Sequence, residues 1–132
     1  MSLTKARAVV LALALAAIVA GVSAQQPGFS RTVLQQVDLS VLGREAVTAI
    51  GAFDPGAVAA RHTHPGEEIA YVMEGTILIE QEGKPPQTYT VGQAFLIPPG
   101  AIHSATNKGS RPAKILGTYI VEKGKPLATP AK

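Results

Sequence analysis

The chain has 132 residues, with 12 Lys and Arg, 9 Asp and Glu, and no cysteine. This length suits one compact domain, and the lack of cysteine excludes a disulfide framework. Two of the basic residues, Lys5 and Arg7, precede an apolar N-terminal run, so the rest of the chain has 10 basic and 9 acidic side chains, a net charge of +1. Because the positive and negative charges nearly cancel, the composition gives no indication of a basic patch that would bind nucleic acid or a membrane surface.

The N-terminus has the pattern of a secretory signal peptide. A positive start is followed by an uncharged run over 8–22, and Val22-Ser23-Ala24 places small side chains at and before a cleavage point. The alternative is a membrane anchor, but the apolar run of about 15 residues is shorter than the roughly 20 that a spanning helix needs. We therefore predict a signal peptide over 1–24, a single domain over 25–132, and a periplasmic or secreted protein with no membrane attachment after cleavage.

The part after Ala24 consists of short apolar or alternating runs separated by Gly and Pro. Turn signals recur about every 8 to 12 residues, which is typical of an all-β sandwich or barrel. The expected strands cover 47–53, 58–64, 69–73, 76–82, 87–91, 94–97, 102–106 and 113–121.

Three segments are less clear. Residues 32–37 have the character of an edge strand, and 39–42 fit either a turn or a single helical turn. The tail over 124–132 contains Pro126 and Pro130 and is expected to be an extended arm or a loose end.

The three histidines of the chain form a pattern with one carboxylate. His62 and His64 are two residues apart on an expected strand, so their side chains share a face. Glu68 follows the turn at Pro65-Gly66, and His103 belongs to a separate strand after its own Pro-Gly turn. Three neutral imidazoles and a carboxylate suit one divalent transition metal ion: Fe, Mn, Ni, Cu, Co or Zn.

The spacing of these residues resembles the two motifs of the cupin superfamily. The first motif spans 56–75 and is matched at Gly56, His62, His64, Glu68 and Gly75. The second spans 92–107 and is matched at Gly92, Pro98, Gly100, His103 and Asn107. The short interval over 76–91 resembles that of small microbial cupins.

The resemblance implies a double-stranded β-helix, the jelly-roll barrel of cupins, with metal ligands His62, His64, Glu68 and His103. Glu67 is the competing carboxylate, but the motif register and the face shared with His62 favour Glu68.

If His62 and His64 point into the barrel, simple alternation places Val58 and Ala60 there as well. Gln93 and Tyr119 are predicted to offer polar atoms to the cavity. Further lining residues are expected to be Ile77, Ile79, Phe95, Ile97 and Ile115, whereas Glu74, Glu80 and Glu82 are expected to face water.

The expected cavity has no evident second acid or base, which argues against epimerases and isomerases. We therefore expect a metal-dependent dioxygenase that acts on a small organic molecule and resembles the quercetinase-like cupins. The alternative is a non-catalytic module that binds metal or a small ligand. Because small cupins resemble one another in pairing their sheets, we also expect a homodimer.

Overall fold

A computed structural model describes residues 26–132 of the chain. The predicted signal peptide over 1–24 lies outside this range. All the regular elements of the described range are β-strands, which confirms the predicted all-β class. This part of the chain includes no helix that is long and apolar enough to cross a membrane.

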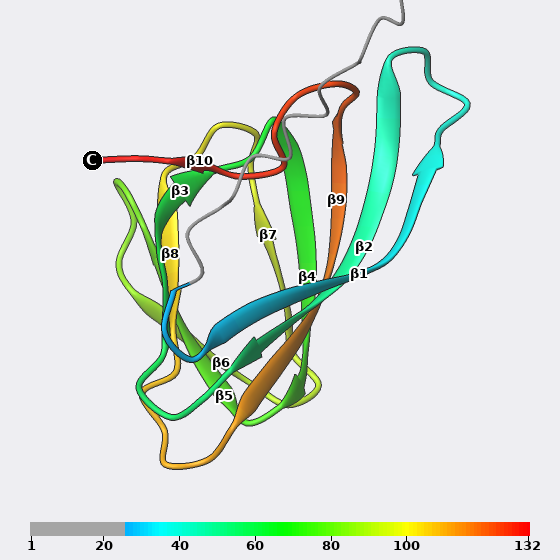
Figure 1. Cartoon of the computed structure of the whole chain (residues 1–132). Coiled ribbons are helices and arrows are strands. Elements are labelled where there is room, and N and C mark those ends of the chain that lie inside the picture. The colour runs from blue at the N-terminus through cyan, green and yellow to red at the C-terminus, as the bar shows by residue number, and fades with distance from the viewer. Residues whose placement is uncertain (1–25) are drawn as a thin grey trace, which may run out of the picture.

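Within residues 26–132, ten strands form two five-stranded antiparallel sheets that face each other as a barrel (Figure 1). The first sheet, in spatial order, consists of β1 (Phe29–Asp38), β2 (Arg44–Phe53), β9 (Ala113–Glu122), β4 (Gly66–Glu74) and β7 (Ala94–Ile97). The second consists of β10 (Thr129–Pro130), β3 (Val58–Thr63), β8 (His103–Thr106), β5 (Thr76–Gln81) and β6 (Gln87–Thr90). This is the predicted jelly-roll barrel.

Glycines at two corners of the barrel explain why the turns can be so tight. Gly56 has φ +80° in the turn between β2 and β3, a conformation that costs glycine little and other residues more. Gly75 has φ +70° between β4 and β5, and a Cβ there would lie 2.6 Å from the carbonyl oxygen of Pro112. Glycine is therefore favoured at Gly56 and required at Gly75, in agreement with the motif.

The core lies between the inner faces of the two sheets. Phe53, Val72 and Ile77 are fully enclosed, and the predicted lining residues Ile77, Ile79, Phe95, Ile97 and Ile115 are all buried. A second, smaller cluster consists of Val47, Ala49, Tyr119 and Val121, against which Leu127 of the C-terminal segment packs. The apolar core thus continues to the end of the barrel where the C-terminal segment crosses it.

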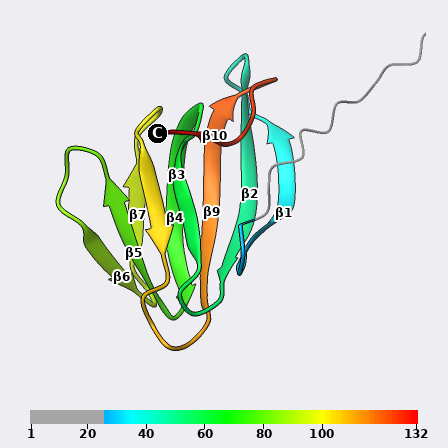
Figure 2. The same ribbon diagram turned by 60° about the vertical axis from the view of Figure 1, so that its left-hand side comes forward.

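The three unclear segments have definite structures. Strand β1 is longer than the expected 32–37 and pairs with β2 along its whole length (Figure 2). Residues 39–42 form a turn and not a helical turn. The tail is an arm: Thr129 and Pro130 pair with Thr63 and His62 at the edge of the second sheet.

Candidate metal centre

Strand β3 and the residue that follows it position His62 and His64, but not by simple alternation. The pairing of β3 with β8 is Ala59 with Ala105 and then His62 with His103, so one extra residue is inserted on β3. Such a β-bulge reverses the face on which the following side chains lie. The prediction that Val58 and Ala60 point inward is therefore wrong: both are exposed, and Ala59 is buried in their place.

Strand β4 positions the carboxylate. Gly66, Glu68, Ala70 and Val72 form its buried face, whereas Glu67 is on the other face and partly exposed. The structure thus brings Glu68, and not Glu67, to the histidines. This agrees with the prediction that Glu68 shares the face of the histidines.

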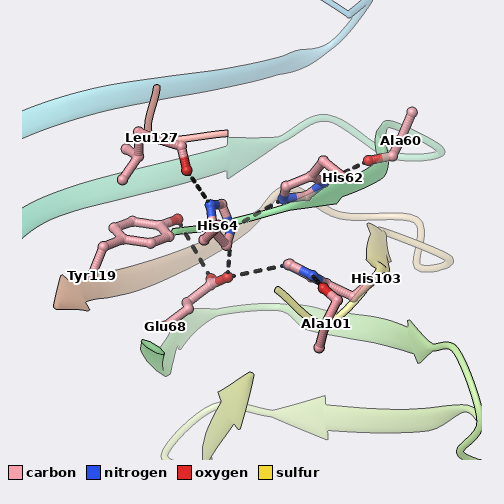
Figure 3. Close-up of polar contacts among 8 residues, drawn as sticks. All are labelled: Ala60, His62, His64, Glu68, Ala101, His103, Tyr119 and Leu127. Atoms are coloured by element: carbon pink, nitrogen blue, oxygen red, sulfur yellow. Dashed lines mark hydrogen bonds and ion pairs between the residues drawn. The ribbon is translucent and has the colours of Figure 1, made fainter. Parts of the chain in front are cut away.

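The four predicted site residues converge on one point (Figure 3). The Nε2 atoms of His62 and His64 are 3.2 Å apart. The Oε2 atom of Glu68 lies 3.0 Å from the Nε2 of His64 and 3.3 Å from the Nε2 of His103. His64, Glu68 and His103 are almost fully buried, and His62 is partly buried at the cavity.

Backbone carbonyls determine which nitrogen of each ring carries a proton. The Nδ1 of His62 lies 2.6 Å from the carbonyl oxygen of Ala60, and the Nδ1 of His103 lies 2.9 Å from that of Ala101. A carbonyl oxygen only accepts hydrogen bonds, so each Nδ1 is the donor. In a neutral imidazole the Nε2 atom then has a free lone pair.

The third imidazole is held by a distant segment. The Nδ1 of His64 donates to the carbonyl oxygen of Leu127, at 2.6 Å, in the C-terminal arm. The sequence contains no signal for this contact, because the acceptor is a backbone atom 63 positions away. The arm therefore orients a ring of the cluster as well as pairing with β3.

This arrangement fits a divalent cation. One ring nitrogen from each of the three histidines lies within 4.8 Å of the other two, and together the rings could hold a metal ion. Donor atoms about 2.1 Å from one ion would be about 3.0 Å apart at right angles and about 3.4 Å apart in a tetrahedron, which brackets the close separations observed. Without a cation, three lone pairs and a carboxylate would face one another in a buried space, which is unfavourable.

The protonation of the cluster follows from its burial and its neighbours. Burial, together with the other two histidines, lowers the pKa of His62 to about 4, despite its hydrogen bond to Ala60. Burial would raise the pKa of Glu68, but the adjacent imidazoles of His103 and His64 outweigh this effect and lower the pKa to about 2. A neutral His62 and an ionised Glu68 are the forms that bind metal.

Tyr119 on β9 completes the contacts of Glu68. Its hydroxyl donates to the Oε1 of Glu68 at 3.4 Å, and its ring packs against that of His64. Burial and the negative charge of Glu68 raise the pKa of Tyr119 well above its usual value, so the hydroxyl keeps its proton. The prediction that Tyr119 faces the site is confirmed.

Gln93 does not reach the site. It is exposed in the turn before β7, where its Oε1 accepts a hydrogen bond from the backbone N–H of Thr90 at 2.8 Å. A turn amide of this kind satisfies a local backbone group instead of facing a cavity. The prediction for Gln93 is therefore wrong.

A small cavity adjoins the cluster. His62, Glu68 and His103 form one part of its wall, and most of the remainder is apolar, including Ile79, Phe95 and Ile115. The space open to the centre of a water molecule is about 20 Å³. Arg31 of β1 also lines this cavity, a charged residue that the sequence analysis did not identify.

Comparison with known proteins gives relatives of the same fold. Over 72 residues the chain is 33% identical to germin-like protein subfamily 2 member 2 of Arabidopsis thaliana. This match covers 51% of the chain. Those residues are 33% of the relative, so the match spans only about a third of the curated protein's length.

Among solved structures, an uncharacterised protein of Klebsiella pneumoniae with a double-stranded β-helix domain superposes with a TM-score of 0.65 at 20% identity. That match covers 80% of this chain and 88% of the other. A recombinant oxalate oxidase in complex with glycolate superposes with a TM-score of 0.64 at 23% identity, over 81% of this chain and 57% of the other. The model of the cupin domain matches residues 49–126, which include all four predicted site residues, and the chain belongs to the cupin family.

Proposed function

We propose that the protein binds one divalent transition metal ion through His62, His64, Glu68 and His103 and acts as a dioxygenase-type oxidoreductase on a small organic molecule. The main support is the cluster itself, in which three Nε2 lone pairs and a carboxylate face one another in a largely buried space. A bound Fe, Mn, Ni, Cu or Co ion would supply the electron chemistry and leave positions open for a ligand.

The rest of the cavity wall supports oxidation more than acid–base catalysis. Apart from the cluster, its ionisable side chains among the described residues are Tyr119 and Arg31. Tyr119 keeps its proton because its pKa is raised, and a guanidinium remains protonated in proteins. Neither group is suited to exchange protons with a substrate near neutral pH, as an epimerase or isomerase would require.

Oxygen consumption tests this function. Purified protein would be loaded separately with Fe, Mn, Ni, Co and Zn, and O₂ uptake would be followed with a panel of small acids, diketones and phenols. We expect uptake with at least one redox-active ion and none with Zn, which is redox-silent. Equal activity with Zn would indicate Lewis-acid chemistry, and binding without turnover by any ion would favour the non-catalytic module.

We propose further that residues 25–132 are one exported domain, released by cleavage after Ala24. Mass spectrometry of protein from the periplasmic or secreted fraction should give a chain that begins at Gln25. An intact N-terminus in the cytoplasmic fraction would contradict this proposal.

The outer face of the first sheet supports the proposed homodimer. Ile69, Tyr71 and Leu96 are 44%, 46% and 53% exposed, and Ile69 pairs directly with Leu96 across β4 and β7. A second copy of the same face would cover it in a two-fold arrangement. Leu96→Glu should therefore produce a monomer in analytical ultracentrifugation, whereas Val58→Glu on the other sheet should not; a dimer in both variants would refute this interface.

A further inference from the structure

Arg31 lies in the wall of the cavity that contains the cluster. It stands on β1 opposite Gly51, and its side chain is partly buried. Its guanidinium carbon is 5.5 Å from the ring centroid of Tyr119 and 5.6 Å from that of Phe29. Two aromatic rings at this distance hold a guanidinium by cation–π attraction and limit where it can move.

Arg31 has no acidic partner in the described part of the chain. None of the ion pairs formed by residues 26–132 includes it. The nearby carboxylate of Glu68 is directed at the cluster: its Oε2 faces the Nε2 atoms of His64 and His103, and its Oε1 accepts a hydrogen bond from Tyr119. By contrast, the exposed Arg61 is paired with Glu82 at 2.6 Å.

A partly buried cation without a counter-ion is unfavourable unless a ligand supplies the charge. The metal cluster adds a second uncompensated positive charge, because a divalent ion held by Glu68 and three neutral imidazoles has a net charge of +1. The cavity wall around these charges is mostly apolar, which strengthens their attraction for an anion. The site therefore favours a negatively charged ligand.

The size of the cavity limits that ligand. About 20 Å³ is open to the centre of a water molecule, whereas one buried water needs roughly 10–15 Å³ measured in this way. Such a space suits an acid of very few heavy atoms and not a polycyclic phenol. A guanidinium is also well shaped to receive two carboxylate oxygens.

We infer that the ligand of this site is a small organic carboxylate and that Arg31 is the residue that recognises its charge. The inference rests on the proposed function, since the metal ion is the other positive group of the site. It goes further in naming the chemical class of the ligand and a specificity residue outside both cupin motifs.

Binding measurements on the Co²⁺-loaded protein test this inference. Isothermal titration calorimetry would compare acetate, glycolate and oxalate with the neutral acetamide and glycolamide, with metal content measured for every variant. We expect the acids to bind more tightly than the amides. Arg31→Gln should weaken binding of the acids about tenfold or more without loss of cobalt, because it removes a charged hydrogen bond.

Two further variants sharpen the comparison. Arg31→Lys should retain part of the preference for acids, because it keeps the charge but loses the forked donor. Arg61→Gln removes an exposed arginine outside the cavity and should bind acids as the wild type does.

Either of two results would overturn the inference: equal affinity of the wild type for acids and amides, or unchanged affinity for acids in Arg31→Gln with full cobalt. If the wild type binds no metal, the proposed function fails. The same titrations of the metal-free protein then test whether Arg31 binds the acid without a metal ion. Weaker acid binding by metal-free Arg31→Gln would support its role, and no difference from the wild type would refute it.

Discussion

Asn107, the last residue of the second cupin motif, is a fully buried amide that connects two corners of the barrel. Its Nδ2 donates to the carbonyl oxygens of Phe53, Asp54 and Arg111 at 3.2, 3.3 and 2.7 Å. Its Oδ1 accepts from the backbone N–H of Gly109 at 2.9 Å. One side chain thus joins the end of β2 to the loop between β8 and β9.

Asn107→Ala should reduce the free energy of unfolding by about 4–6 kcal/mol. An amide has two donor hydrogens, so the four contacts amount to about three hydrogen bonds, each with a net value near 1 kcal/mol. Buried carbonyls that lose their donor add about 1–3 kcal/mol. For a domain of about 100 residues the melting temperature should fall by roughly 20–25 °C.

Urea titration and thermal melting of the metal-free protein would measure the loss. Asn107→Asp should cost at least as much, because a carboxylate would face three carbonyl oxygens in a buried space. The matched control is Gln35→Ala, which removes an exposed amide with a single 3.1 Å hydrogen bond to Thr48 and should change stability by no more than about 0.5 kcal/mol. A loss below about 1 kcal/mol in Asn107→Ala would refute the reasoning.

Three other predictions concern metal binding, folding and the pH dependence of stability. His103→Ala should lose most of the bound metal in elemental analysis, whereas Glu67→Ala, on the opposite face of β4, should keep it; full metal in the first would mean that the motifs do not share one ion. Gly66→Ala should prevent folding as judged by circular dichroism, since a Cβ would lie 1.9 Å from a carbonyl oxygen of β9, while Gly124→Ala, with open space around it, should fold. The free energy of unfolding of the metal-free protein should fall as the pH is lowered from about 6.5 to about 4, because His62 in the unfolded chain takes up a proton that the folded site resists. His62→Ala should flatten this part of the pH profile, and an unchanged profile would contradict the assignment.

Turns and alternation are local features and were sufficient to predict an all-β sandwich or barrel, and the resemblance to the cupin motifs implied the clustering of the four site residues. Alternation failed at β3, where a one-residue bulge follows Ala59. Ala59 and Ala60 are chemically identical, so neither the composition nor the pattern indicates which of them points inward. The resulting error reversed Val58 and Ala60 but not His62 and His64, which lie after the bulge.

The failures at Arg31 and Gln93 have a different origin. We expected the first strand to begin at residue 32, and this placed Arg31 outside it. The sequence nevertheless has two large side chains, Phe29 and Arg31, two positions apart and separated by a small polar residue. Gln93 was expected to contribute to the site, yet its side chain bonds to the backbone of its own turn. Both are single polar residues near strand ends, where a shift of one position changes the face on which a side chain lies.

The positions of these residues in the two sheets separate metal binding from ligand choice. His62 and His103 belong to β3 and β8 of the second sheet, and Glu68 to β4 of the first, so an ion bound among them would connect the two sheets and add to stability. Arg31 lies on β1, an edge strand of the first sheet, which among the described strands pairs only with β2. A substitution at Arg31 can therefore alter the charge of the cavity without moving the strands that position the metal ligands, which is why Arg31→Gln is expected to keep its metal while losing its preference for acids.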